Sequence, residues 1–202
     1  MSERLRPLIQ RAVLDIVEYD YQTRTEMVQL NRQMPFCVMS YLKRGEALLR
    51  IQDREYCCRD GDAIFVPPNV IHDHVKMSRE ESEFLWWHFN FRTAYNIDVL
   101  SLLKLPCKVH MENSSEFEQK FFDYMEAIQN EETIADMIYK NAKALEVLAC
   151  IFDSFLKSEK TQLAPDIPAV FMDIFDDISQ RPTAGMNLSL IHISEPTRRV
   201  VI

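Results

Sequence analysis

Short hydrophobic and aromatic runs alternate with polar residues along the first half of the chain. Six such runs lie between Ala12 and about Phe91, and they read "AVLDIVEYDY", "FCVMSYLKR", "EALLRIQ", "REYCCRD", "DAIFVPP" and "FLWWHFNFR". They are rich in β-branched and aromatic residues, and the turn-forming stretches "KRGE", "RDGD" and "PPN" separate them. Strands that follow one another this closely predict a β-sandwich or a small β-barrel.

The pattern becomes helical after Arg92. "NIDVLSLLKL" predicts a short helix, and "CKVHM" predicts one further strand. In "SSEFEQKFFDYMEAIQ", Ser115 and Glu118 have the spacing of a capping box, and the apolar residues that follow recur at helical spacing. A second helix is predicted from roughly Thr133 to Leu156.

These two helices carry more apolar residues than one stripe against a barrel requires. Packing of the helices against each other accounts for part of that surface. We expect the remainder to meet a second copy of the chain, so that a charged residue at Leu148 or Phe152 would give monomers.

The last part of the chain has a different character. The polar stretch "KSEKTQLAPDIP" predicts a linker, and "AVFMDIFDDISQ" predicts one more amphipathic helix. The stretch "LSLIHISEPTR" resembles the conceptual translation of a transposon-end adapter used in sequencing libraries. Residues 188–202 are therefore expected to be foreign to the natural gene, and His192 is given no function.

Composition narrows the class of protein. With 202 residues, 47% of them hydrophobic, the chain can form one well-cored domain with an appendage. It has no apolar run of membrane-spanning length, and "MSERLRPLIQ" is not a secretory signal, so no membrane contact is expected. A net charge of -8 argues against a nucleic-acid-binding surface. Five cysteines without a C-x-x-C pair predict neither disulfides nor structural zinc, and a reducing cytoplasm fits best.

Two stretches carry candidate binding residues. His72 and His74 lie two positions apart in "GDAIFVPPNVIHDH" and face the same way on a strand. In "LWWHFNF", Trp86, His88 and Asn90 share one face, and the opposite face is wholly apolar. A metal site needs three or four converging ligands, and His72, His74 and His88 are the only histidines on the predicted barrel strands.

The first half of the chain also resembles a known family. "GDAIFVPPNVIH" approximates the second cupin motif, G-x5-P-x-G-x2-H, with Asn69 in place of the later glycine. The stretches "RGEA", "REYCCRDGD", "PPNVIH" and "WWHF" follow the order found in the N-terminal sensor domain of AraC-type transcriptional regulators. The resemblance covers about Met27 to Arg92.

This resemblance implies a mainly β fold with α, namely a cupin-like β-barrel (jelly roll) followed by a two-helix dimerisation segment. The implied division is a barrel with an N-terminal arm in residues 1–97, the helical segment in 98–157, a linker in 158–168, the start of a truncated helix-turn-helix domain in 169–190 and the foreign tail in 188–202. The first dozen residues are expected to form a mobile arm.

The resemblance also implies a ligand rather than a metal. Metal-binding cupins carry an H-x-H in their first motif, but no histidine is present in "GEALLRIQDREY". No metal, no cofactor and no catalysis are therefore expected. The family's ligand-binding positions correspond to Arg32, His74, Trp86 and His88, which implies a sugar-like metabolite held by stacking and polar contacts. His72 is expected to be a structural residue, hydrogen-bonded beside the turn.

The function expected is effector sensing and homodimerisation in an AraC-like regulator that contacts DNA only through its missing C-terminal domain. Two alternatives stay open. One is a free-standing cupin enzyme (isomerase, epimerase or dioxygenase) that uses a metal held by barrel histidines. The other is a purely structural dimerisation module with a filled barrel, in which Trp86 and His88 are core residues and Arg32 is a surface charge.

Overall fold

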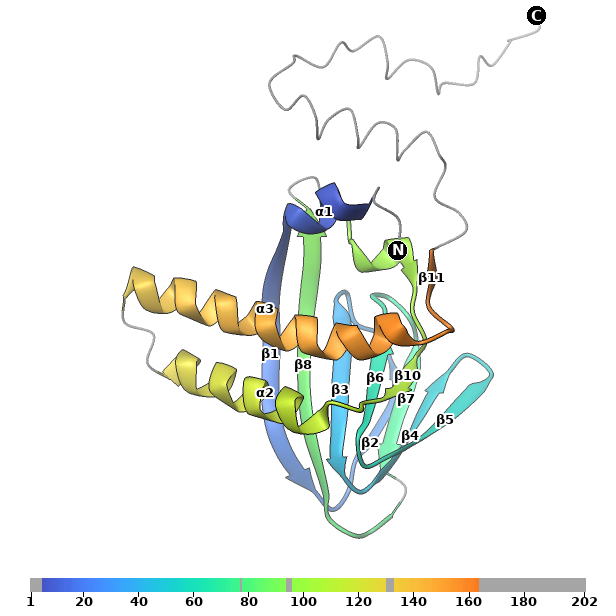
Figure 1. Ribbon diagram of the computed structural model, residues 1–202. Helices are drawn as coiled ribbons and strands as arrows, with labels where there is room; N and C mark the ends of the chain where they lie inside the picture. The colour runs from blue at the N-terminus through green and yellow to red at the C-terminus, as the bar shows by residue number, and fades with distance from the viewer. Residues whose placement is uncertain (1–4, 77, 94–95, 130–132, 164–202) are drawn as a thin grey trace, which may run out of the picture.

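A computed structural model describes residues 5–76, 78–93, 96–129 and 133–163 (Figure 1). The strands run β1 (Ala12–Arg24), β2 (Val28–Arg32), β3 (Cys37–Arg44), β4 (Glu46–Ile51), β5 (Arg54–Arg59), β6 (Asp62–Val66), β7 (His72–Lys76), β8 (Ser82–Thr93), β9 (Leu103–Lys104), β10 (Lys108–His110) and β11 (Gln162–Leu163). The helices are α1 (Arg6–Gln10), α2 (Ser114–Gln129) and α3 (Ile134–Lys157), with a 3₁₀ turn, η2, at Leu100–Leu102.

Two antiparallel sheets form the barrel. The larger sheet has the order β1-β8-β3-β6-β10, and the smaller has the order β2-β7-β4-β5. Apolar side chains between the two sheets form one core cluster, which includes Val38, Leu49, Ile64 and Phe84. The predicted cupin-like fold, mainly β with α, is confirmed.

The helices α2 and α3 lie side by side across the outer face of the larger sheet (Figure 1). A second core cluster joins them to that face: the Trp87 ring packs on Phe117 and Phe121 with centroids 5.9 and 5.6 Å apart, and Phe65 packs on Phe152 and Phe155. The wholly apolar face of β8 therefore supports the helices, as period-two alternation requires.

Both main helices were expected, but the capping box was placed on the wrong one. α2 begins at Ser114, so Ser115 lies inside the helix. The carboxylate of Glu118 accepts a hydrogen bond at 2.8 Å from the hydroxyl of Tyr41, a residue of β3, instead of closing a capping box with Ser115. The capping box is formed at α3 instead, between Thr133 and Asp136, at the predicted start of that helix.

One local prediction around residue 100 is corrected and one is confirmed. "NIDVLSLLKL" forms the short turn η2 and the strand β9 rather than a regular helix, and "CKVHM" contains strand β10 as predicted. Within the expected N-terminal arm, Leu5 and Leu8 are buried together with Leu102. Strand β11 pairs with β9 in the same region.

Leu148 and Phe152 are not surface residues. They are 6% and 7% exposed and belong to the core beneath α3, so a charged residue there would break the fold before it affected an interface. Most of the exposed apolar residues of α3 lie in its first half instead, namely Ile134, Met137, Ile138, Tyr139 and Leu145; Leu156 near the end of the helix is also exposed.

Several predictions lie outside the described residues. These are the end of the linker (164–168), the start of the helix-turn-helix domain (169–190) and the tail (188–202). Within the described part, no helix is both long enough and apolar enough to span a membrane.

Candidate ligand-binding site

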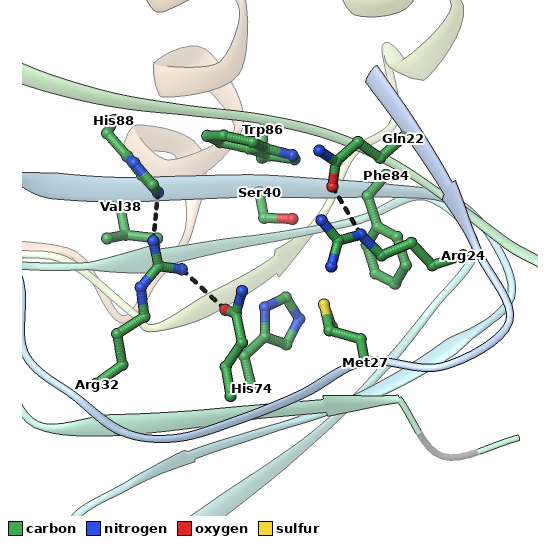
Figure 2. Close-up of a pocket in the computed structure, with 11 residues that line it drawn as sticks. Gln22, Arg24, Met27, Arg32, Val38, Ser40, His74, Phe84, Trp86 and His88 are labelled. Carbon is green, nitrogen blue, oxygen red and sulfur yellow. Dashed lines mark hydrogen bonds between the residues drawn. The ribbon is translucent and has the colours of Figure 1, made fainter. Parts of the chain in front are cut away.

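A cavity of about 220 Å³ opens between the two sheets where β1, β2, β3, β7 and β8 come together (Figure 2). All four residues that the sequence predicted for the site line it. The full lining comprises polar, cationic, aromatic and aliphatic side chains from these strands and from the connection between β1 and β2: Gln22, Arg24, Met27, Gln29, Arg32, Val38, Ser40, His74, Phe84, Trp86 and His88.

Alternation along β8 places two of these residues. Trp86 and His88 face the cavity, whereas Trp87 between them faces the helices. The neighbouring strand β1 has an irregularity in its pairing between Ile16 and Glu18, after which Glu18 lies opposite His88. From there, every second residue of β1 lies beside the cavity-facing side chains of β8.

A bulge in β2 positions Arg32. Gln29 pairs with His74 and Arg32 with His72, so two residues of β2, Leu30 and Asn31, lie opposite the single residue Asp73 of β7. Asn31, within the bulge, has a left-handed φ of 51°, and its backbone N–H donates to Asp73 Oδ1 at 2.8 Å. Without the extra residue, Gln29 and Arg32 would face opposite sides. With it, both line the cavity.

Arg32 and His88 form one polar end of the cavity. An Arg32 Nη2–H group donates to His88 Nε2 at 3.3 Å, and Nη1 donates to Gln29 Oε1 at 2.8 Å (Figure 2). His88 Nδ1 lies 3.1 Å from Glu18 Oε2. Since Nε2 accepts from Arg32, the imidazole carries its proton on Nδ1 and donates it to Glu18.

Burial and the Arg32 charge both lower the pKa of His88, against the opposing effect of Glu18. The ring is therefore neutral near pH 7. Both of its nitrogens already have protein partners, so a metal ion at Nε2 would first have to displace Arg32.

Arg24 forms the other polar end. Its Nε donates to Gln22 Oε1 at 2.7 Å, and Gln22 Nε2 donates to Asp20 Oδ2 at 2.6 Å. In Figure 2 the guanidinium group of Arg24 points into the cavity opposite Arg32. The Gln22 side chain thus orients the Arg24 guanidinium group and lies between it and the Asp20 carboxylate, which does not contact Arg24 directly.

His74, a buried residue of β7, lines the cavity from the smaller sheet. Burial lowers its pKa to about 4, with smaller contributions from His72 and Arg32, so the ring is neutral near pH 7. Its ring packs edge-on against Phe84, with centroids 5.9 Å apart. A neutral imidazole can donate one hydrogen bond and accept another, which suits a ligand hydroxyl.

His72 lies beside this site but does not line it. Its Nδ1–H donates to the Val70 carbonyl at 3.0 Å, as expected for a residue that stabilises the turn. Its Nε2 is buried without a hydrogen-bond partner among the described residues. The same part of the chain contains no group of three or more His, Cys, Asp or Glu side chains arranged to hold a metal ion.

The turn before β7 explains the departure from the cupin motif. Asn69 has a φ of 62°, in the left-handed region that glycine adopts freely, and asparagine is one of the few other residues that tolerates it. Its backbone N–H donates to the Met34 carbonyl at 2.7 Å. Asn69 can therefore replace the glycine without changing the turn.

One wall of the cavity is aromatic. The centroids of the Trp86 and His88 rings lie 4.8 Å apart, and Phe36 stacks on His88 with the ring centroids 5.0 Å apart. Trp86 is half-buried, so part of its ring is available to a ligand. An aromatic wall between two polar ends is the usual composition of a small-molecule pocket.

Seven lining residues were missed by the sequence analysis, among them Arg24, Gln22, Gln29 and Ser40. Two of them, Gln22 and Arg24, could have been predicted from the sequence, because polar residues occupy every second position from Glu18 to Arg24 in "VEYDYQTR". Ser40 could have been found by its two-residue spacing from Val38 on β3.

Comparison with known proteins adds the following. A model of the AraC-like ligand binding domain family matches residues 29–148. Among solved structures, a cupin superfamily protein from Desulfitobacterium hafniense DCB-2 aligns with a TM-score of 0.30 and 13% identity, over 38% of this chain and 75% of that one. The protein YhaK from Escherichia coli aligns with a TM-score of 0.37 and 11% identity, over 50% and 44%. A mutant oxalate decarboxylase from Bacillus subtilis aligns with a TM-score of 0.28 and 17% identity, over 38% and 22%. No curated protein matches the sequence significantly.

Proposed function

This chain belongs to the AraC-like ligand-binding domain family, and we propose that it is the effector-sensing part of an AraC-like DNA-binding transcription regulator. The observation that carries this proposal is that Arg32, His74, Trp86 and His88 line a single cavity within the family's domain. The effector is a small polar metabolite of sugar size, and the domain binds it without a metal and without catalysis.

The size and lining of the cavity support a ligand of this kind. Its volume of about 220 Å³ lies below the ~300–1,000 Å³ of pockets for drug-sized molecules, so it suits a molecule of monosaccharide size. A sugar ring can place its C–H face on Trp86 and its hydroxyls on His74 and His88. A wrong ligand that leaves one of these buried groups unpaired loses roughly 1–3 kcal/mol per group, which gives the pocket its selectivity.

The arrangement of the histidines favours binding over metal-dependent catalysis. A cupin enzyme would need His72, His74 and His88 to converge on one ion. His72 lies outside the lining, and His88 is held between Arg32 and Glu18.

Ligand binding acts on the rest of the regulator by shifting an equilibrium. Arg32 and His74 come from the smaller sheet and Trp86 and His88 from the larger, so a ligand that contacts all four favours one relative position of the two sheets. The larger sheet carries α2 and α3, and β9 pairs with β11 at the start of the linker. The ligand shifts the regulator only as far as its affinity differs between the two arrangements.

Self-association belongs to the same proposal. The exposed apolar residues Ile134, Met137, Ile138 and Leu145 recur at helical spacing on the first half of α3. We assign this stripe, rather than the buried Leu148 and Phe152, to the contact with a second copy of the chain.

Isothermal titration of the purified protein with a panel of monosaccharides, sugar acids and sugar phosphates tests the function. One binding site per chain is expected, and Trp86→Ala should abolish it while the protein still unfolds cooperatively. Binding that persists in Trp86→Ala would place the ligand elsewhere. Stoichiometric iron, manganese, nickel or zinc that survives dialysis would favour a metal enzyme instead.

A further inference from the structure

The cavity contains two guanidinium groups whose contacts in the structure are neutral. Arg24 donates to the amide oxygen of Gln22, and Arg32 donates to the amide oxygen of Gln29 and to the neutral ring of His88. Neither arginine forms an ion pair with a carboxylate among the residues that the structure describes. Both positive charges therefore remain available to a ligand.

The nearby carboxylates do not cancel these charges by contact. Glu18 and Asp20 lie on β1 next to the cavity but do not line it. Glu18 accepts from His88, and Asp20 accepts from Gln22. The remaining titratable groups of the lining are the two histidines, whose pKa values burial lowers, so they add no charge near pH 7.

Arg24 has the freer guanidinium of the two. Only its Nε is engaged, at 2.7 Å from Gln22 Oε1, and its terminal Nη1 and Nη2 groups have no partner in the described part of the chain. These two groups form a planar pair of donors that matches the two oxygens of a carboxylate or phosphate. Arg32 uses one terminal nitrogen on Gln29 and the other on His88.

Burial of Arg32 adds to the attraction of the cavity for an anion. Desolvation lowers its pKa, and the Glu18 carboxylate opposes this only from beyond the intervening His88 ring. In a partly desolvated cavity an anion gains more from each arginine than it would in water, because the effective dielectric constant is lower.

We propose that the effector is an organic anion of monosaccharide size, whose carboxylate or phosphate group binds the terminal nitrogens of Arg24. This rests on the proposed function and names the chemical class of its ligand. The sugar-like body lies on Trp86, and the hydroxyls at its far end reach Arg32 and His88. Gln22 is a positioning residue, because its amide oxygen fixes the orientation of the Arg24 guanidinium.

The test compares neutral and anionic compounds that are otherwise alike. The probes are glucose, galactose and mannose, their uronates, and their 6-phosphates, each titrated calorimetrically into the purified protein at low and at moderate salt. At least one anionic compound is expected to bind tenfold or more tighter than its neutral parent. Whether the uronate or the phosphate binds distinguishes the two sources of negative charge.

Variants link the preference to Arg24. Arg24→Gln should reduce binding of the preferred anion roughly 10- to 100-fold, the usual range for a charge-assisted pair of hydrogen bonds, and should leave the parent sugar nearly unaffected. The matched control is Arg50→Gln, on an exposed arginine of β4 that pairs with Glu55 away from the cavity. It should change neither affinity.

The outcomes separate the two proposals. Neutral sugars that bind as tightly as their acids, or an anion preference that survives Arg24→Gln, overturn the anionic ligand and leave effector sensing intact. Failure of every neutral and anionic compound to bind overturns both. Thermal unfolding of Arg24→Gln confirms that the variant is folded before its affinity is interpreted.

Discussion

The two adjacent tryptophans of β8 should respond in opposite ways to substitution. Trp86 faces the cavity and is half-buried, whereas Trp87 is 2% exposed and packs on Phe117 and Phe121 between the sheet and the helices. We predict that Trp87→Ala mainly lowers the free energy of unfolding, and that Trp86→Ala mainly abolishes ligand binding.

The magnitudes follow from burial. Removing a fully buried tryptophan costs about 3–5 kcal/mol, which for a domain of this size corresponds to a loss of roughly 6–20 °C in Tm. The Trp87 indole N–H is buried without a hydrogen-bond partner among the described residues. Because Trp87→Ala also removes this unsatisfied donor, the loss in the free energy of unfolding should lie near the lower end of that range. Trp86 forms the wall of an open cavity, so Trp86→Ala should cost only about 1–2 kcal/mol.

Unfolding in urea and intrinsic fluorescence measure both effects. The chain has two tryptophans, so Trp87→Phe leaves Trp86 as the only indole, and Trp86→Phe leaves only Trp87. Ligand should change the emission of the Trp87→Phe protein and leave that of the Trp86→Phe protein unchanged. If Trp86→Ala and Trp87→Ala destabilise the protein equally and ligand changes neither emission, the barrel is a filled core and Trp86 does not contact a ligand.

Three further outcomes are expected. Asn69→Ala should lower stability by about 1 kcal/mol, because alanine disfavours a φ of 62°, while Asn69→Gly stays within about 0.5 kcal/mol in urea titrations; equal losses would refute this. The pKa of His74, lowered by burial to about 4 from 6.5, means that the unfolded chain binds this proton first as pH falls. The contribution of neutral His74 to the free energy of unfolding is therefore complete above pH 6.5, and the free energy of unfolding should fall by about 2 kcal/mol between pH 7 and pH 5. The fall should be smaller in His74→Gln, and equal falls in the two proteins would contradict this assignment. In sedimentation experiments, Ile138→Glu on the exposed stripe of α3 should yield monomers, while Val28→Glu, at a similarly exposed apolar position on β2, should not; a dimer that survives Ile138→Glu places the contact elsewhere.

The predictable part of the fold depended on local periodicity. The two faces of β8 could be separated in the sequence because side chains alternate strictly on a strand, and the structure places Trp86 toward the cavity and Trp87 toward the helices. The start of α3 was predicted near Thr133 from the helical spacing of its apolar residues, and the structure forms a capping box there.

What could not be predicted depended on contacts between distant segments. Glu118 had the spacing of a capping residue, but the hydroxyl of Tyr41 on another element binds it instead. Leu148 and Phe152 were taken for interface residues because helical spacing shows that a stripe is apolar but not which surface covers it.

The residues of the candidate site also differ in how far local sequence could predict them. The position of Arg32 depends on a bulge in β2, which periodicity does not reveal, and it was predicted from the family resemblance alone. Arg24 was missed although it alternates with Gln22, because both faces of β1 carry polar groups and the sequence does not show which face lines the barrel.

The most direct measurement is a crystal structure of the protein with the tightest-binding compound of the panel. We predict one organic molecule in the cavity between the sheets, stacked on Trp86 and hydrogen-bonded to Arg32 and His88. A metal ion coordinated by His72, His74 and His88, or a ligand bound outside this cavity, would contradict it.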